Sequence, residues 1–86
     1  MAVYGVEIRP AALKDLRALD RPVQRRIATA IDALAREPRP QGAKKLVSAD
    51  DLYRVRVGDL RIVYAIDDRV LTVLVVRIRH RREVYR

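Results

Sequence analysis

The sequence contains no cysteine and only one histidine, His80. Without cysteine there can be no disulfide and no thiolate metal site, and nothing indicates an oxidising compartment. With one histidine, a ribonuclease that pairs two histidines as acid and base is excluded. The longest apolar stretch, Val70 to Val76, is too short to span a bilayer, and the N-terminal residues show no export signal. We therefore expect a cytoplasmic protein with no membrane contact.

Other catalytic patterns are missing as well. There is no glycine-rich nucleotide-binding loop, no pair of carboxylates placed for acid and base catalysis, and no serine, histidine and aspartate set. Glu83 stands among arginines and is expected to pair with one of them. The common hydrolase and nucleotide-binding classes are therefore not indicated.

Positive charge is what the sequence has in excess. Nineteen lysines and arginines against eleven acidic residues give a net charge of +8 over 86 residues, and the isoelectric point is about 10.8. A chain of this length is expected to form a single domain over residues 1–86. In residues 52–86 all the basic side chains are arginine. Nucleic acid is the expected partner.

The first half of the chain predicts a strand and two helices. Residues 2–8 alternate as in a strand, and Pro10 can open a helix. The apolar positions of this helix are Leu13, Leu16 and Leu19. Its polar positions, expected to face water, are Lys14, Asp15 and Arg17.

A second helix is predicted after Asp20, whose side chain can cap it, and Pro22 fits its first turn. Its apolar stripe consists of Val23, Ile27, Ala30, Ile31 and Leu34. Pro38, Pro40 and Gly42 end the helix and form a loop that presents Lys44 and Lys45.

From residue 52 the apolar pattern changes to a period of two. It predicts strands over residues 52–57, 60–66 and 70–78, joined by short turns at Gly58-Asp59 and at residues 67–69. The predicted order is β-α-α-β-β-β. We expect an α+β fold in which a helical hairpin packs on one face of a small antiparallel sheet.

Turn geometry predicts a cluster of arginines on the other face. A two-residue turn at Gly58-Asp59 places Arg56 opposite Arg61, with Arg54 two positions along on the same face. Like charges directly opposite one another destabilise a strand pair. We interpret the cluster as a phosphate-binding surface, because arginine matches phosphate bidentately; the alternative is that these arginines only keep the open face soluble.

The last strand can join the same surface. A three-residue turn over residues 67–69 pairs Ile66 with Val70 and places Arg61 opposite Val75. Side chains expected on the arginine side are then Arg77, Arg79 and Arg81, with Val76 and Ile78 facing the helices. A two-residue turn at this point would instead place these arginines on the opposite face of the sheet.

Tyr85 lies close to the arginines in the sequence. Neighbouring positive charge can lower the pKa of a phenol from about 10, so Tyr85 is a candidate base or stacking platform; alternatively its ring packs on the sheet edge. His80 could assist proton transfer or stack on a base, but a surface role is the simpler interpretation.

Three segments of the second half stand out together: Leu52-Tyr53-Arg54-Val55-Arg56-Val57, Leu60-Arg61-Ile62-Val63-Tyr64, and Val76 through His80-Arg81-Arg82-Glu83-Val84-Tyr85-Arg86. Their order and spacing resemble the RelE/ParE superfamily of bacterial toxins. The opening Tyr4-Gly-Val-Glu-Ile-Arg-Pro-Ala-Ala-Leu-Lys-Asp-Leu is also similar to that superfamily, so the resemblance covers essentially the whole chain. It is closer to the RelE type.

The resemblance implies an activity. RelE-type toxins cleave mRNA in the ribosomal A site by attack of the RNA's own 2′-hydroxyl on the adjacent phosphate, with no metal and no cofactor. The residues that the resemblance makes catalytic are Arg54, Arg56, Arg61, Arg81 and Tyr85. Those expected to contact RNA backbone are Lys44, Lys45, Arg77, Arg79 and His80.

Two departures from the RelE pattern bear on these roles. Arg54 and Arg56 stand where the family often has lysine, which keeps the charge but removes a group with an easily tuned pKa. Arg79 stands where glycine is common, so either Arg79 or Arg81 can be the catalytic arginine.

The resemblance also implies partners. They are a cognate antitoxin, mRNA and ribosomal RNA, and the complex with the antitoxin is expected to bind its own operator DNA through the antitoxin. A ParE-like toxin that inhibits DNA gyrase without catalysis, and a plain nucleic-acid-binding module, remain the alternatives.

Overall fold

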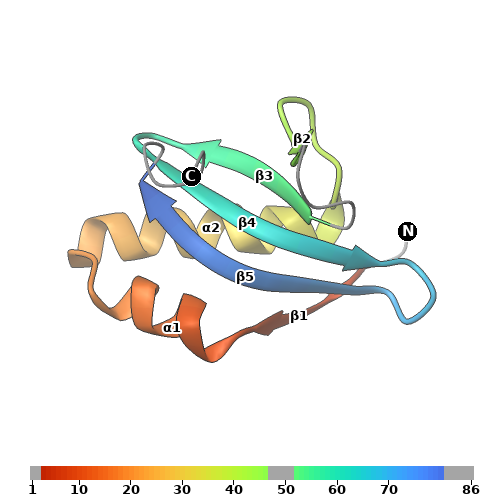
Figure 1. Cartoon of the computed structure of the whole chain (residues 1–86), viewed down its shortest axis with the longest axis horizontal. Helices are drawn as coiled ribbons and strands as arrows, with labels where there is room; N and C mark the ends of the chain where they lie inside the picture. The colour runs from red at the N-terminus through yellow and green to blue at the C-terminus, as the bar shows by residue number, and fades with distance from the viewer. Residues whose placement is uncertain (1–2, 47–51, 81–86) are drawn as a thin grey trace.

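The computed structural model describes residues 3–46 and 52–80. The elements are β1 (Gly5–Ile8), α1 (Pro10–Arg17), α2 (Arg21–Arg36), β2 (Lys44–Lys45), β3 (Leu52–Val57), β4 (Leu60–Asp67) and β5 (Thr72–His80). Five strands form one sheet in the order β1-β5-β4-β3-β2, and the two helices pack against it (Figure 1). The predicted α+β fold, with a helical hairpin on one face of a small sheet, is confirmed.

The sheet is mixed, so the prediction of a purely antiparallel sheet is wrong on this point. β1 runs parallel to β5, with Gly5 opposite Thr72 and Ile8 opposite Val75. No tight turn joins these two strands, so nothing in the local sequence fixes their relative direction. The structure also adds β2, which pairs antiparallel with β3 where a loop was predicted.

Both helices begin as the sequence predicts, but one cap differs. Pro10 and Pro22 lie in the first turns of α1 and α2. Asp20 occupies the N-cap position of α2, yet its side chain makes no capping hydrogen bond. Its backbone carbonyl instead accepts the N–H of Gln24 at 2.8 Å. Within the described residues, no helix is long and apolar enough to cross a membrane.

The core lies between the helices and one face of β4 and β5. Its buried side chains are Ala12, Ile27, Ile31, Leu34, Leu60, Ile62, Tyr64, Val73, Val75 and Ile78. Burying each large aliphatic chain stabilises the fold by about 1.5–3 kcal/mol. The Tyr64 hydroxyl donates a hydrogen bond of 2.7 Å to the carbonyl of Pro38. It thereby ties the loop after α2 to the centre of the sheet.

The turn between β4 and β5 is longer than predicted. One carboxylate oxygen of Asp67 accepts the backbone N–H of Arg69 at 2.9 Å and that of Val70 at 3.4 Å. Leu71 adopts a left-handed conformation with φ of 49°, and the hairpin closes where Asp67 pairs with Thr72. This Asp-based turn takes up one more residue than the sequence pattern suggests.

The register between β4 and β5 is consequently different. Ile66 pairs with Val73 rather than Val70, and Arg61 lies opposite Arg79 rather than Val75. The partner of Ile66 is thus displaced by three residues, and a bulge between Val63 and Tyr64 raises the displacement to four at Arg61. Because the total shift is even, Arg77 and Arg79 still project on the same side as Arg61, as predicted.

Candidate nucleic-acid interface

Three arginines from three neighbouring strands lie side by side on the face of the sheet that the helices leave open. The two-residue turn at Gly58 and Asp59 pairs Val57 with Leu60, so Arg56 lies opposite Arg61 as predicted. On the other side of β4, Arg61 lies opposite Arg79. Directly opposed side chains in a sheet have Cβ atoms about 4.5–5.5 Å apart. We call Arg56, Arg61 and Arg79 the arginine row.

A second row of basic residues runs beside the first, two positions along each strand. Lys44 on β2 lies opposite Arg54 on β3, and Arg54 lies opposite Val63 on β4. Arg77 on β5 lies opposite Val63 from the other side. Lys45 pairs with Tyr53, and strand alternation turns it to the other face. The predicted placement of Arg54 on the arginine side is confirmed.

The members of the arginine row differ in exposure. Arg56 is exposed, and Arg61 and Arg79 are half-buried. The Nε of Arg56 donates to the carbonyl of Gly58 at 2.9 Å, within its own turn. Gly58 has a positive φ of 60°, a conformation that glycine adopts without steric cost. The tight turn thus both sets the register of the row and orients its outer member.

A carboxylate on α1 holds the end of the second row. Asp15 accepts hydrogen bonds from Arg77 Nε at 2.8 Å and Nη2 at 3.1 Å, and from the backbone N–H of Ile78 at 3.0 Å. Partial burial acts to raise the pKa of the Asp15 carboxyl, but the hydrogen bonds from Arg77 and Ile78 and the charges of Arg77 and Arg79 outweigh it and hold the pKa below its ordinary value.

The prediction that Asp15 faces water is therefore wrong. Its side chain is only 18% exposed. Helical periodicity could not reveal the contact, because the partner lies 62 residues further along the chain.

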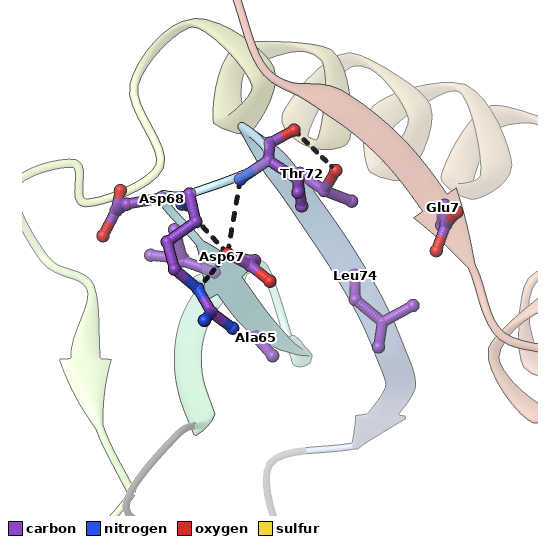
Figure 2. A pocket seen from close by; sticks show the side chains of 9 residues that line it. Glu7, Ala65, Asp67, Asp68, Thr72 and Leu74 are labelled. Atoms are coloured by element: carbon purple, nitrogen blue, oxygen red, sulfur yellow. Dashed lines mark hydrogen bonds and ion pairs between the residues drawn. The ribbon is translucent and has the colours of Figure 1, made fainter.

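The opposite end of the open face is acidic and partly apolar. A hollow there is lined by three acidic residues, Glu7, Asp67 and Asp68, with Arg69 from the turn, around Ala65 and Leu74 (Figure 2). Figure 2 also shows that Asp67 turns back to its own hairpin, where it bonds the backbone that follows it. The positive rows are thus confined to the half of the face nearest the β3–β4 turn.

Asp68 takes part in a network of hydrogen bonds and an ion pair that joins separate parts of the fold. It accepts the Tyr4 hydroxyl at 2.6 Å and pairs with Arg39 at 3.0 Å, and the Arg39 guanidinium lies 5.5 Å from the ring centre of Tyr53. The hydrogen bonds from Arg39 and then from Tyr4 lower the pKa of Asp68. The same bond to Asp68 raises the pKa of Tyr4. This network joins the residue before β1, the loop after α2 and the β4–β5 turn.

The remaining predicted site residues are placed only in part. Arg81 and Tyr85 lie outside the described residues. His80 ends β5, is exposed, and lies opposite Leu60. Within residues 3–46 and 52–80, no three histidine, aspartate or glutamate side chains gather so that they could hold a metal ion.

Comparison with known proteins gives consistent matches. Residues 6–85 match the family described as ParE toxin of type II toxin-antitoxin system, parDE. The putative toxin RelE1 of Methanocaldococcus jannaschii is 33% identical over 81% of this chain and 83% of its own length. Toxin RelG of Mycobacterium tuberculosis is 32% identical over 96% of this chain and 97% of its own length.

The same relationship holds in three dimensions. The archaeal RelE–RelB complex from Pyrococcus horikoshii contains a chain that is 30% identical to this one, with a TM-score of 0.82 over 96% of this chain and 99% of that chain. A family match over nearly the whole chain and relatives above 30% identity agree with the resemblance seen in the strands. The chain therefore belongs to the RelE/ParE superfamily of toxins from type II toxin–antitoxin systems, and stands closer to its RelE members.

Proposed function

We propose that this toxin is an endoribonuclease that cleaves mRNA on the ribosome without a metal ion. The observation that carries the proposal is the arginine row, in which Arg56, Arg61 and Arg79 from three strands stand directly opposite one another. Like charges directly opposite one another repel, and a bound anion would relieve that repulsion. The arginine row is a site for an anion, and a phosphate in RNA supplies one.

The reaction that fits begins with the RNA itself. The 2′-oxygen bonds to the adjacent phosphorus, its proton passes to a base, the bond from phosphorus to the 5′-oxygen breaks, and the 5′-oxygen takes up a proton from solvent. The products are a 2′,3′-cyclic phosphate and a 5′-hydroxyl. Negative charge builds on the phosphorane in between, and fixed cations aimed at it supply several kcal/mol of stabilisation. Arg56 and Arg61 are assigned to that role.

The remaining roles follow from the resemblance to RelE. Tyr85 is assigned as the base that takes the 2′-hydroxyl proton, and Arg81 supports the leaving 5′-oxygen. Arg54 lowers the pKa of the base or holds phosphate. Arg79 is the alternative to Arg81, and its position opposite Arg61 supports a place for it at the reacting phosphate.

The other basic residues are proposed to hold the RNA backbone. Lys44 continues the second row outward from Arg54. Lys45 is exposed on the other face of the same edge strand, so its proposed contact with RNA is made around that edge. Arg77 and His80 flank Arg79 at the end of β5. Contacts to phosphate of this kind position a strand without reading its sequence.

A cognate antitoxin is the proposed protein partner. The Pyrococcus horikoshii relative was crystallised as a RelE–RelB complex, and a toxin of this kind has to be held in check. An antitoxin with acidic residues would fit the basic half of the open face. The complex is proposed to bind its operator DNA through the antitoxin, in the cytoplasm.

Primer extension on translated messages after induction of the chain tests the proposal. We expect cuts in phase with codons, and 2′,3′-cyclic phosphate at the new ends. Arg61→Ala and Tyr85→Phe should abolish the cuts. Arg25→Ala, which removes the same charge from the exposed surface of α2, should leave them unchanged. Cutting that persists in both site variants would contradict the assignment.

One observation favours a second function. The family that matches this chain is named for the ParE toxin. The alternative predicted from the sequence is a ParE-like inhibitor of DNA gyrase. Supercoiling assays with purified gyrase separate the two functions. Inhibited supercoiling together with intact messages would establish the alternative and exclude the nuclease.

A further inference from the structure

Asp15 on α1 accepts three hydrogen bonds from β5, two from the Arg77 side chain and one from the backbone N–H of Ile78. Both of its oxygens are used: one accepts Arg77 Nε and the backbone N–H of Ile78, and the other accepts Arg77 Nη2. The side chain is 18% exposed, so water competes weakly for these bonds. Helix α1 is in this way attached to one defined point of β5.

The attachment falls where β5 has lost its neighbouring strand. β1 pairs with β5 only from Thr72 to Val75, and the last bond along this edge runs from the Arg9 N–H to the Val75 carbonyl at 2.9 Å. Beyond Val75, α1 takes the place of β1 and packs against β5. Asp15 then receives the Ile78 N–H that an outer strand would otherwise receive.

The same stretch of β5 contains the bulge. The register with β4 shifts between Val63 and Tyr64, so that Val76 has no directly opposed residue. A bulge breaks the ladder locally and bends the strand. The position of Arg79 opposite Arg61 therefore depends on how the backbone is held after the bulge, and Ile78 is the residue immediately before Arg79.

We propose that Asp15 is a positioning residue for the arginine row, which through Ile78 and Arg77 fixes the end of β5 so that Arg79 stands in line with Arg61 and Arg56. Arg77 is then a structural cation held on α1 as well as a neighbour of the RNA. This inference rests on the proposed nuclease function for its catalytic consequence. Its structural consequence is independent of any activity.

Preorganisation decides the size of the effect. Displacing a catalytic group by about 1 Å can cost up to about 100-fold in rate. Asp15→Ala removes all three bonds, and we expect single-turnover cleavage of a bound RNA to slow by roughly 10- to 100-fold. RNA affinity should change by less than about threefold, because no phosphate-binding cation is removed.

Two further variants separate the contribution of the bonds to Arg77 from that of the bond to Ile78. Asp15→Asn keeps one oxygen that can accept the Ile78 N–H but loses the full bond set to Arg77, so its rate should be intermediate. Arg77→Ala leaves the bond between Asp15 and Ile78, and combining it with Asp15→Ala should slow cleavage no further than Asp15→Ala alone. Asp32→Ala, on the exposed side of α2, is the control for loss of a helical aspartate.

Amide hydrogen exchange supplies a readout that needs no cleavage. In Asp15→Ala the Ile78 amide should exchange at least about tenfold faster, in Asp15→Asn the acceleration should be smaller, and the core amide of Ile62 should change in neither variant. Unchanged exchange at Ile78 overturns the proposal whether or not the protein cuts RNA. So does a folded Asp15→Ala variant that cuts at the wild-type rate. Absence of cleavage in the wild type, with faster exchange at Ile78, refutes the nuclease function alone.

Discussion

Removing one hydroxyl from the core tests how the loop after α2 is held. Tyr64 is fully buried, and its hydroxyl donates to the Pro38 carbonyl at 2.7 Å. Tyr64→Phe leaves that buried carbonyl without its donor, which costs about 1–3 kcal/mol. In a domain of this size each kcal/mol lowers the Tm by roughly 4–8 °C. We therefore expect a fall in Tm of at least about 4 °C.

The same residue predicts how stability depends on pH. Burial, and secondarily the nearby Tyr53, raises the pKa of Tyr64 from 10.0 to about 12. The folded state therefore favours the neutral phenol. Its contribution is complete below the unfolded pKa and is lost as pH rises through the folded pKa, between about pH 10 and about pH 12. A shift of this size corresponds to about 3 kcal/mol.

Urea unfolding followed by circular dichroism measures both effects. The wild type should lose about 2 kcal/mol more than Tyr64→Phe between about pH 9 and about pH 12, because the folded phenol is only half ionised at the upper limit. Tyr53→Phe is the matched control, because it removes a hydroxyl from a neighbouring tyrosine but leaves the buried phenol of Tyr64 in place. The ring of Tyr53 stacks on that of Tyr64 with centroids 5.9 Å apart, and the Tyr53 hydroxyl accepts a 3.3 Å bond from exposed Arg39. Equal pH dependence in the wild type and Tyr64→Phe would refute this account of the buried phenol.

Three further predictions concern binding, packing and the tight turn. Arg56→Gln should reduce the slope of log affinity for single-stranded RNA against log salt by about 0.7, as loss of one phosphate contact requires; an unchanged slope in titrations would place RNA elsewhere. Ile27→Ala, at a fully buried position, should cost about 2–5 kcal/mol in chemical unfolding, and a cost below about 1 kcal/mol would contradict the assigned core. Gly58→Ala should cost about 1–2 kcal/mol because φ is 60° there; thermal melts check it, and a neutral result would mean that the turn can change type.

Much of the fold could be predicted from local patterns. Helix α2 follows the apolar stripe that contains Ile27, Ile31 and Leu34, and β3 has the predicted bounds. The pairing of Arg56 with Arg61 followed from the turn at Gly58 alone. These features depend on residues that are close in sequence, where periodicity and turn chemistry decide the outcome.

What could not be predicted depends on distant residues. The parallel pairing of β1 with β5 joins Gly5 to Thr72, and no turn type encodes it. The register that brings Arg79 beside Arg61 needs both the Asp67 turn and a bulge. The bulge shifts the inward positions from Val73 and Val75 to Ile78, a change of phase that a single alternating strand does not predict. The contact of Asp15 with Arg77 likewise joins two elements that meet only in the folded chain.

The strand order has a consequence for how the molecule is made. β5 lies between β1 and β4 in the sheet but is synthesised after all the other strands of the described residues. Until residues 72–80 have left the ribosome, β1 has no partner and β4 lacks one of its two neighbours. Contacts of such long sequence separation close late in folding. A nascent chain therefore carries its arginines on separate, unassembled segments, and the complete row exists only after translation of this strand is finished.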